Sequence, residues 1–246
     1  MGYHESLTEG RNAVLEAFRS GKTVDRLFVL DGCQDGPVKT ILREAKKQDT
    51  MVQYVKKERL DQLSETKNHQ GVIAYCAACE YAEVSDILEN AKKKGEAPFI
   101  VLLDGIEDPH NLGAIIRTAN QAGAHGVIIP KRRAVGLTAT VARTSAGAVK
   151  YTPVAKVTTL VTVMEDLKKE GMWFVCADMD GEEMYSLNLK GPIGLVIGNE
   201  GEGVSRLVKE HCDMVASIPM KGDIDSLNAS VAMGVLAYEI VRQRRF

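Results

Sequence analysis

Three separated stretches of the sequence each join a short apolar segment to a loop of glycines and polar side chains. They are residues 102–117, 193–203 and 218–230. Apolar segments alternating with helical patterns predict an α/β fold, with a mainly parallel sheet covered by helices on both faces. Ligands bind at the carboxyl ends of strands in such sheets, so we expect the three loops to form one site.

The third stretch places several polar side chains in the expected first turn of a helix. Asp225, Ser226, Asn228 and Ser230 stand there, where free backbone N–H groups bind anions or polar ligands. Ser226 as the N-cap would explain one of these residues. It would not explain Asn228, so the stretch is a candidate ligand site.

The first stretch has the signature of a strand followed by a helix. Asp108 and Pro109 are typical of an N-cap and a first helical residue. We expect this helix to carry Arg117 inward. Gly113 lies one turn before Arg117 and would leave room for a substrate beside the guanidinium group.

Together the stretches resemble the motifs of the SpoU family of RNA ribose 2′-O-methyltransferases. The first motif is Asn111 followed by Arg117, the second is residues 198–201, and the third runs from residue 218 to residue 228. The likeness covers roughly residues 1–245, with the motifs in family order. It is greatest to bacterial enzymes that methylate a guanosine ribose in 23S ribosomal RNA, whose N-terminal substrate domain ends in His-Gln-Gly-Val, here residues 69–72.

The resemblance implies S-adenosylmethionine as the methyl donor, a C-terminal trefoil knot and a homodimer. Donor contacts carry over to Gly198, Ile218 and Leu227. The family's active-site positions correspond to Asn111, Arg117, Glu200, Ser226 and Asn228. Periodicity does not reveal a knot, and ordinary connection rules predict an unknotted sheet. The apolar terminal helix is either buried in its own domain or shared with a partner subunit.

Methyl transfer to a ribose hydroxyl requires alignment of donor and oxygen, and removal of the oxygen's proton. Arg117 has so high an ordinary pKa that phosphate binding and alkoxide stabilisation are favoured over action as a base. A strongly perturbed arginine is the alternative. Glu200 would orient Arg117 or cap a loop, and Ser226 and Asn228 would position the loop and the substrate. Taken singly, Arg117 is explained by a surface salt bridge and Glu200 by a solvated turn.

Composition limits the remaining possibilities. The net charge of −2 argues against indiscriminate nucleic-acid binding but permits local basic patches. Lys131, Arg132 and Arg133 form the best candidate for RNA contact, because they follow an expected strand on the motif side of the sheet. Five scattered cysteines favour a reducing cytoplasm. No apolar run is long enough for a membrane span, and the N-terminus lacks a signal-peptide apolar region.

No metal site is expected, because the histidines lack ligand spacing and Cys76-Ala-Ala-Cys79 has no second such pair. That cysteine pair is interpreted as structural. The chain also lacks the glycine motifs of Rossmann and P-loop enzymes.

The expected domains are an RNA substrate-binding α/β domain at residues 1–78, a linking helical segment at 79–97 and a methyltransferase domain at 98–246. Strands are expected at residues 26–30, 51–55, 72–77, 99–103, 127–129, 173–177, 195–197 and 214–218. Helices are expected at residues 38–47, up to 122, near 138–145, near 160–170, shortly after 203 and at the C-terminus.

Four functions remain in competition with a 23S ribosomal RNA guanosine enzyme. They are a tRNA ribose methyltransferase, a ribosomal RNA enzyme for another nucleotide, an RNA-binding ribosome assembly factor without catalysis, and a small-molecule nucleotide enzyme. The intact motif residues speak against the assembly factor, and the large N-terminal domain against the small-molecule enzyme. The N-terminal domain favours ribosomal RNA over tRNA by analogy with the family.

Overall fold

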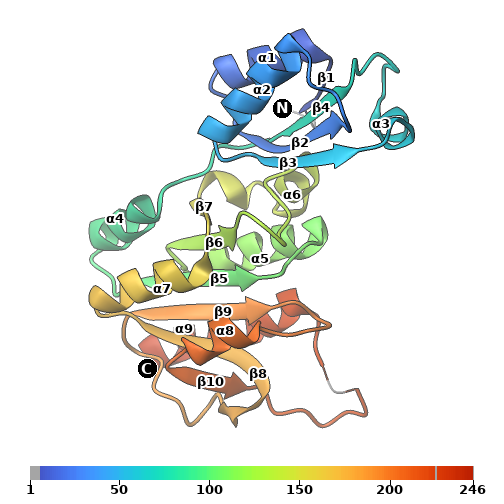
Figure 1. Ribbon diagram of the computed structural model, residues 1–246. Coiled ribbons are helices and arrows are strands. Elements are labelled where there is room, and N and C mark those ends of the chain that lie inside the picture. The colour runs from blue at the N-terminus through green and yellow to red at the C-terminus, as the bar shows by residue number, and fades with distance from the viewer. Residues whose placement is uncertain (1–5, 225, 246) are drawn as a thin grey trace. The chain divides into compact units, whose positions relative to one another are not determined.

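The computed structural model describes residues 6–224 and 226–245. The chain forms two compact units (Figure 1). The first contains residues 1–80 and 136–140, and the second contains residues 81–135 and 141–246. Each unit has its own sheet and its own hydrophobic core.

The first unit is a four-stranded sheet in the order β1-β4-β2-β3, in which β2 and β3 are parallel and the other neighbours antiparallel. Its elements are β1 (Ser6–Glu9), α1 (Arg11–Arg19), β2 (Val24–Leu30), α2 (Gly36–Lys47), β3 (Met51–Val55), α3 (Lys57–Leu63) and β4 (Val72–Cys76). The predicted strands and the predicted helix of this unit are confirmed. The sequence interpretation had not identified β1, α1 and α3.

Amphipathic helices account for this arrangement. Asp35 caps α2 by accepting a hydrogen bond from the backbone N–H of Val38. The apolar faces of α1 and α2 then pack on one face of the sheet, around Val14, Leu27 and Ile41. Leu60 of α3 packs with Phe28 and Ile73 in a separate cluster.

The second unit contains a six-stranded sheet in the order β10-β8-β9-β5-β6-β7, and all neighbouring pairs are parallel. Its strands are β5 (Phe99–Asp104), β6 (Gly126–Pro130), β7 (Val154–Val157), β8 (Trp173–Glu183), β9 (Ile193–Gly198) and β10 (Met214–Ser217). Its helices are α4 (Val84–Lys94), α5 (Pro109–Gln121), α7 (Leu160–Lys169), α8 (Arg206–Glu210) and α9 (Ala229–Arg245), while α6 (Ala139–Thr144) begins within residues of the first unit. A 3₁₀ turn spans Ala148–Lys150.

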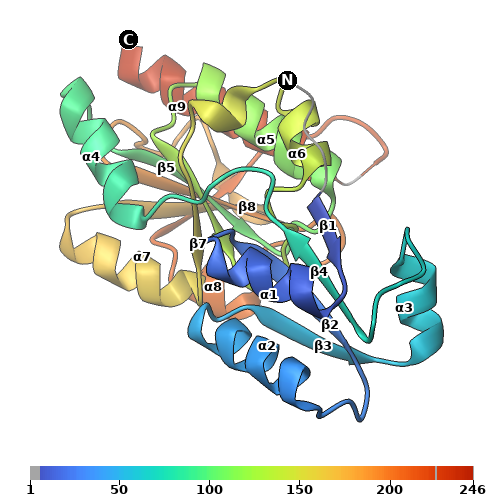
Figure 2. The ribbon, with the colours of Figure 1, turned by 90° about the horizontal axis from the view of Figure 1, so that it is seen from above.

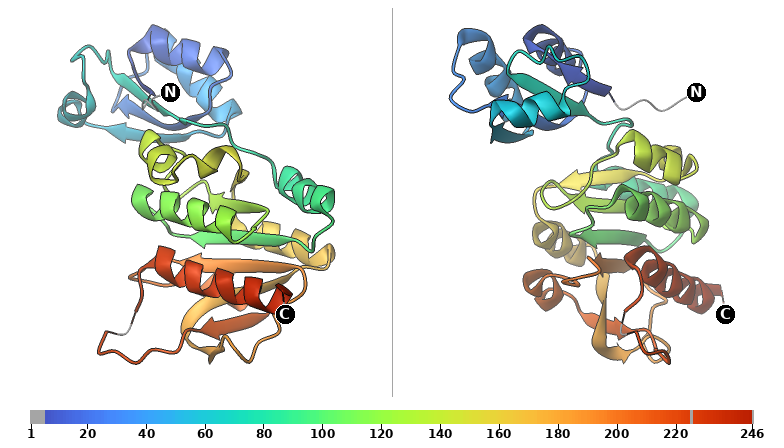
Figure 3. Two further views of the ribbon diagram at one scale, coloured as in Figure 1. Left: turned by 180° about the vertical axis from the view of Figure 1, so that it is seen from behind. Right: turned by 90° about the vertical axis from the view of Figure 1, so that its right-hand side faces the viewer.

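This parallel sheet confirms the predicted α/β class. The expected strands and helices are present, but β8 is longer than predicted and β7 was not identified. Helices α5 and α9 cover one face of the sheet, and α7 and α8 cover the other (Figure 2). The terminal helix, red in Figure 3, packs beside α5 and against β9.

The central strands β5, β6 and β9 are buried along almost their whole length. Strands covered on both faces have continuous apolar sequences rather than alternating ones, which is why these segments could be identified from sequence. Their carboxyl ends lead into the polar loops. Within the described parts of the chain, no helix is both long and apolar enough to cross a membrane.

Candidate active site

A cavity of about 630 Å³ lies at the carboxyl ends of β8, β9 and β10. Its size is typical of small-molecule sites. The three residues expected to bind the methyl donor, Gly198, Ile218 and Leu227, all line it. Glu200 and Ser226, expected to belong to the active site, line it as well.

Hydrogen bonds join the three sequence motifs beside this cavity. The Glu200 carboxylate accepts from Asn111 Nδ2 at 2.5 Å and from Asn228 Nδ2 at 3.0 Å. The backbone N–H of Ala229 donates to the same Glu200 oxygen at 3.4 Å. Asn228 Nδ2 also donates to Asn111 Oδ1 at 2.9 Å. Residues separated by 117 positions in the chain are therefore in direct contact.

Asn228, rather than Ser226, occupies the N-cap position of α9. Its carbonyl accepts from the N–H of Ala232 at 2.9 Å, and its side-chain oxygen accepts from the N–H of Ser230 at 3.0 Å. Asn228 thus combines a capping role with contact to Glu200. Ser226 is exposed on the cavity wall.

The loop between residues 199 and 203 is tightly constrained. Asn199 Oδ1 accepts from the N–H groups of Gly201 and Glu202, at 2.7 and 3.2 Å. Asn199 Nδ2 donates to the carbonyl of Gly105, which follows β5. A Cβ on Gly198 would lie 2.0 Å from the carbonyl carbon of Gly203. Gly198 is therefore required for the close return of its own loop, and the donor contact that the family resemblance implies for it stays a prediction.

Two expectations for the first motif are wrong. Arg117 is exposed rather than turned inward, because six residues along a helix rotate it by about 240° from Asn111. Among the described residues Arg117 has no hydrogen-bond or ion-pair partner, so Glu200 orients Asn111 and Asn228 instead. Gly113 leaves no room for substrate, because a Cβ there would lie 1.8 Å from Thr144 Oγ1.

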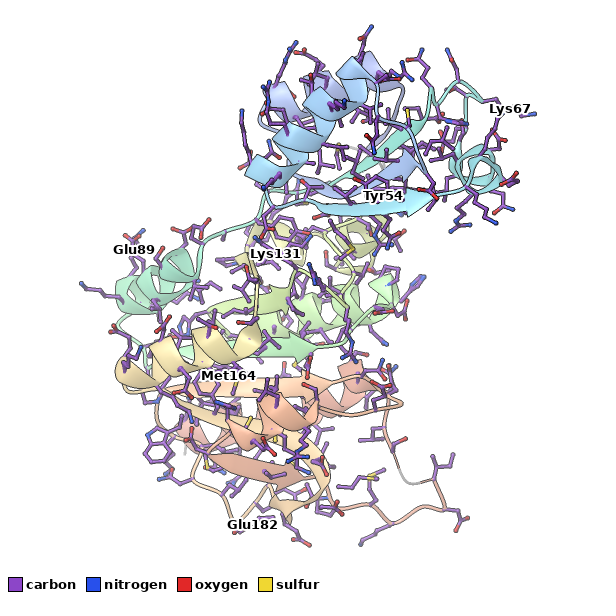
Figure 4. All side chains as sticks on the ribbon, viewed as in Figure 1. Tyr54, Lys67, Glu89, Lys131, Met164 and Glu182 are labelled. Carbon is purple, nitrogen blue, oxygen red and sulfur yellow. The ribbon has the colours of Figure 1, made fainter. Side chains whose placement is uncertain are left out.

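The basic segment after β6 lies next to the second motif. Lys131, labelled in Figure 4, is half-buried, and Arg132 and Arg133 are exposed. Arg133 Nη2 forms an ion pair with Glu202 Oε2 at 2.9 Å. Glu202 lines the cavity. The sequence contained no signal for this contact, which joins residues 69 positions apart.

A second ion pair on the cavity wall was also missed by sequence reasoning. Lys209 of α8 lies 2.7 Å from Asp178 of β8, and Asp178 lines the cavity. Burial by itself would raise the pKa of Asp178, but hydrogen bonds from Lys209 and from the N–H of Asp180 hold that pKa below its ordinary value. Asp178 is therefore a carboxylate fixed beside the site.

In the first unit, the His-Gln-Gly-Val segment forms a turn closed by the side chain of His69. His69 is buried and accepts from the N–H of Gly71 through Nδ1, while Nε2 lies 3.0 Å from Asp61. Gln70 and Gly71 both have positive φ. Arg11 donates to the carbonyl of Gln70 at 3.0 Å.

The cysteines and possible metal ligands show no catalytic arrangement in the described residues. None of the five cysteines, all of which the structure describes, forms a disulfide bond, and Cys76 is buried in the core of the first unit. No group of three or more histidine, cysteine, aspartate or glutamate side chains that could hold a metal is found within residues 6–224 and 226–245.

Three motifs meet at the carboxyl edge of this parallel sheet. Comparisons with known proteins show that this arrangement belongs to a class of RNA methyltransferases. The model of the SpoU rRNA methylase family matches residues 98–238, and that of the RNA 2′-O ribose methyltransferase substrate-binding domain matches residues 7–82. The chain belongs to the SpoU family. It is an S-adenosylmethionine-dependent RNA methyltransferase.

Among curated relatives, YacO of Bacillus subtilis, described as a TrmH family tRNA/rRNA methyltransferase, is 48% identical over 237 residues. The match covers 96% of this chain and 94% of YacO. A relative from Staphylococcus saprophyticus with the same description is 44% identical over 243 residues, covering 98% of this chain and 97% of its own.

Solved structures give the same assignment. The SpoU methyltransferase AviRb of Streptomyces viridochromogenes, in complex with AdoMet, is similar with a TM-score of 0.62 and 27% identity, covering 98% of this chain and 91% of AviRb. An AdoMet-bound rRNA methyltransferase of Sinorhizobium meliloti has a TM-score of 0.59 and 25% identity, covering 96% and 86%. The A. aeolicus TrmH/SpoU tRNA modifying enzyme has a TM-score of 0.55 and 27% identity, covering 65% and 84%.

Proposed function

We propose that the protein methylates the 2′-hydroxyl of a ribose in RNA, at a guanosine of 23S ribosomal RNA. The observation that supports this most is the contact between Asn111, Glu200 and Asn228 beside the cavity. Those residues come from the three motifs of the family, and the cavity is lined by the expected donor-binding positions.

The cavity suits S-adenosylmethionine in size and charge. Its volume of about 630 Å³ is adequate for a molecule of that size. Carboxylates of Asp178, Glu183, Glu200 and Glu202 line it. Lys209 pairs with Asp178 and Arg133 with Glu202, so Glu183 and Glu200 are the carboxylates that complement the positive charge of a sulfonium. We propose that Gly198, Ile218 and Leu227 hold the donor, which supplies an electrophilic methyl group.

The polar cluster would orient the RNA. Glu200 accepts hydrogen bonds from both asparagine side chains, which fixes the amide groups at the cavity edge. Asn111 and Asn228 position the ribose, and Ser226 on the cavity wall contacts the substrate. Arg117 binds the neighbouring phosphate and stabilises the negative charge that develops on the 2′-oxygen as its proton passes to water.

Arg117 would act in the cavity of a second subunit. Its exposure and its rotation away from Asn111 place it outside the cluster of its own chain. On the adjacent helix α9, Val231 and Tyr238 are about half exposed although apolar. Seven residues apart, they lie on one face of the helix. A symmetric dimer through α5 and α9 would cover them and would bring Arg117 to the partner's site.

The first experiment measures methyl transfer from tritiated S-adenosylmethionine to unmodified ribosomal RNA. Arg117→Ala should lower the rate by about 100-fold or more with the fold retained. Arg206→Ala, which removes an exposed arginine on α8, serves as the matched control and should retain the rate. Donor binding without transfer by the unmodified protein would instead identify an assembly factor.

Mixing two inactive variants tests whether the site is shared. In a heterodimer of Arg117→Ala and Glu200→Ala chains, one of the two sites would contain both native residues. After subunit exchange we expect about one quarter of the original activity. No recovery, with exchange verified by mass, would place Arg117 in the site of its own chain.

The N-terminal unit supports ribosomal RNA as substrate. The similar protein described as an rRNA methyltransferase covers 96% of this chain, and the one described as a tRNA modifying enzyme covers 65%. The curated relatives carry both terms, tRNA and rRNA, in their descriptions. Mapping 2′-O-methylation across all RNA of a deletion strain should show one guanosine of 23S ribosomal RNA unmethylated. A methyl group missing from tRNA would favour the alternative.

Three further properties are part of this proposal. The family likeness supports a C-terminal trefoil knot. We place RNA binding in residues 1–78 and in Lys131, Arg132 and Arg133, with 79–97 as the link to a catalytic domain at 98–246. Cysteines without disulfide bonds are consistent with a cytoplasmic enzyme.

A further inference from the structure

The ion pair between Arg133 and Glu202 joins the proposed RNA-binding segment to the loop that carries Glu200. Arg133 has a φ of 55°, an uncommon backbone conformation for a residue with a side chain. The two side chains are 64% and 76% exposed. Backbone outliers of this kind concentrate at functional sites, which is a reason to ask what Arg133 does.

Both backbones that carry the pair are anchored independently of it. The N–H of Lys131 donates to the carbonyl of Val157 at 2.8 Å, and the N–H of Val135 donates to that of Ile106 at 3.0 Å. On the other side, Asn199 fixes the loop at residues 199–203. The ion pair is therefore dispensable for the fold, and only its two side chains must move to break it.

The chemistry of the pair permits exchange. A guanidinium group fits a carboxylate and a phosphate with the same fork of N–H donors. An ion pair as exposed as this one is weak in water, so a phosphate brought close by other contacts can displace the carboxylate. The side chains of Glu200 and Glu202 both extend from the loop at residues 199–203. A phosphate bound by Arg133 would therefore lie close to the proposed catalytic cluster around Glu200.

We propose that Glu202 is a positioning residue that holds Arg133 at the cavity until a phosphate of the RNA replaces it. Arg133 is then a direct RNA contact next to the methylated nucleotide, and Glu202 is its competitor in the RNA-free protein. This inference rests on the proposed function, because it takes RNA as the substrate. It adds that Arg133 is the cation that becomes available to the RNA and that Glu202 is the carboxylate that pairs with it beforehand.

The experiment measures binding of in vitro transcribed, unmodified 23S ribosomal RNA at several salt concentrations. Glu202→Gln should tighten binding by about two- to fivefold, because Arg133 no longer has a competing partner. Arg133→Gln should weaken binding and reduce the slope of log Kd against log salt by about one. In the double variant the gain from Glu202→Gln should disappear.

Glu89→Gln is the matched control, because Glu89, labelled in Figure 4, is an exposed partner of Lys93 on α4. It should leave RNA binding unchanged. The inference is overturned if Glu202→Gln fails to tighten binding, or if it does so equally with Arg133 replaced. Melting temperatures of the variants exclude loss of the fold as the cause.

Methyl transfer by the unmodified protein, measured in parallel, separates this inference from the proposed function. The expected binding pattern without any transfer would reject the enzyme but retain the exchange of Arg133. Methyl transfer, together with independent effects of Glu202→Gln and Arg133→Gln on RNA binding, would support the enzyme and reject the exchange of Arg133 from Glu202 to RNA.

Discussion

The loop at residues 199–203 and the segment at residues 218–224 border the same cavity, yet they are held in different ways. The side chain of Asn199 forms hydrogen bonds within the loop at residues 199–203 and one to Gly105, which follows β5. In contrast, among the described residues no hydrogen bond holds the backbone of 218–224. Met220 and Ile224 of that segment are 40% and 75% exposed.

We predict from this difference that one wall of the cavity is formed before a ligand binds and that the other adapts to it. A preformed wall keeps Glu200 in place to accept from Asn111 and Asn228. An exposed segment with few contacts costs little to rearrange and can close on the donor.

The largest effect is expected for Gly198→Ala on the preformed side. The new Cβ would collide with the backbone of Gly203 and Val204, which should lower the free energy of unfolding by about 1–3 kcal/mol. Displacement of the loop should also weaken donor binding by about tenfold or more, equivalent to about 1.4 kcal/mol. Thermal unfolding and calorimetry with S-adenosylmethionine measure the two quantities.

Gly222→Ala is the matched control on the adaptable side, since a Cβ there meets no atom within 4 Å. Its melting temperature should equal that of the unmodified protein. An equal loss of stability in both variants would contradict the contrast between the two walls.

Hydrogen exchange should show a selective effect of the donor. At a donor concentration one hundred times Kd, amides of residues 218–224 that exchange only from the donor-free form should slow by about 100-fold. Amides of residues 199–203 should change little, because they are already held. Mass spectrometry of peptides from the two regions compares them directly. Equal protection of both would mean that neither wall is preformed.

The smallest effect is expected on the pH dependence of stability. It concerns His125, which lies at the end of β5 opposite to the preformed wall. Buried His125 accepts from the N–H of Phe99 at 2.9 Å through Nδ1, and its Nε2 lies 3.0 Å from Glu96. Burial lowers the pKa of His125, against the opposing effect of Glu96. The folded protein therefore disfavours the protonated form.

Because the unfolded chain binds this proton more readily, stability should be full above about pH 6.5 and fall below it. The loss continues down to the pKa of folded His125, at up to about 1.4 kcal/mol per pH unit. Thermal unfolding at pH 7.5 and 5.5 measures it. His125→Gln should flatten this dependence, and His110→Gln, which changes an exposed histidine, should not. A variant as pH-sensitive as the original would exclude His125 as the cause.

Much of the fold could be predicted from sequence, because buried elements have characteristic patterns of apolar residues over a few consecutive positions. The buried strands β5, β6 and β9 have continuous apolar sequences, and Asp108 and Pro109 mark the start of α5. Strands β1 and β7 escaped identification, since each has only 4 residues and polar side chains interrupt the apolar ones. The equally short β10 was predicted because its sequence, Met-Val-Ala-Ser, is mostly apolar.

The sequence by itself determined that the three motif loops follow strands at the carboxyl edge of the sheet, because strand ends, glycines and polar loops can be identified from local sequence. Only the tertiary structure decided their contacts: that Glu200 orients two asparagines, that Arg133 pairs with Glu202, and that Arg117 is exposed. Those contacts depend on the direction of side chains from elements far apart in the chain. Such directions are set by packing and helix rotation, which local sequence does not encode.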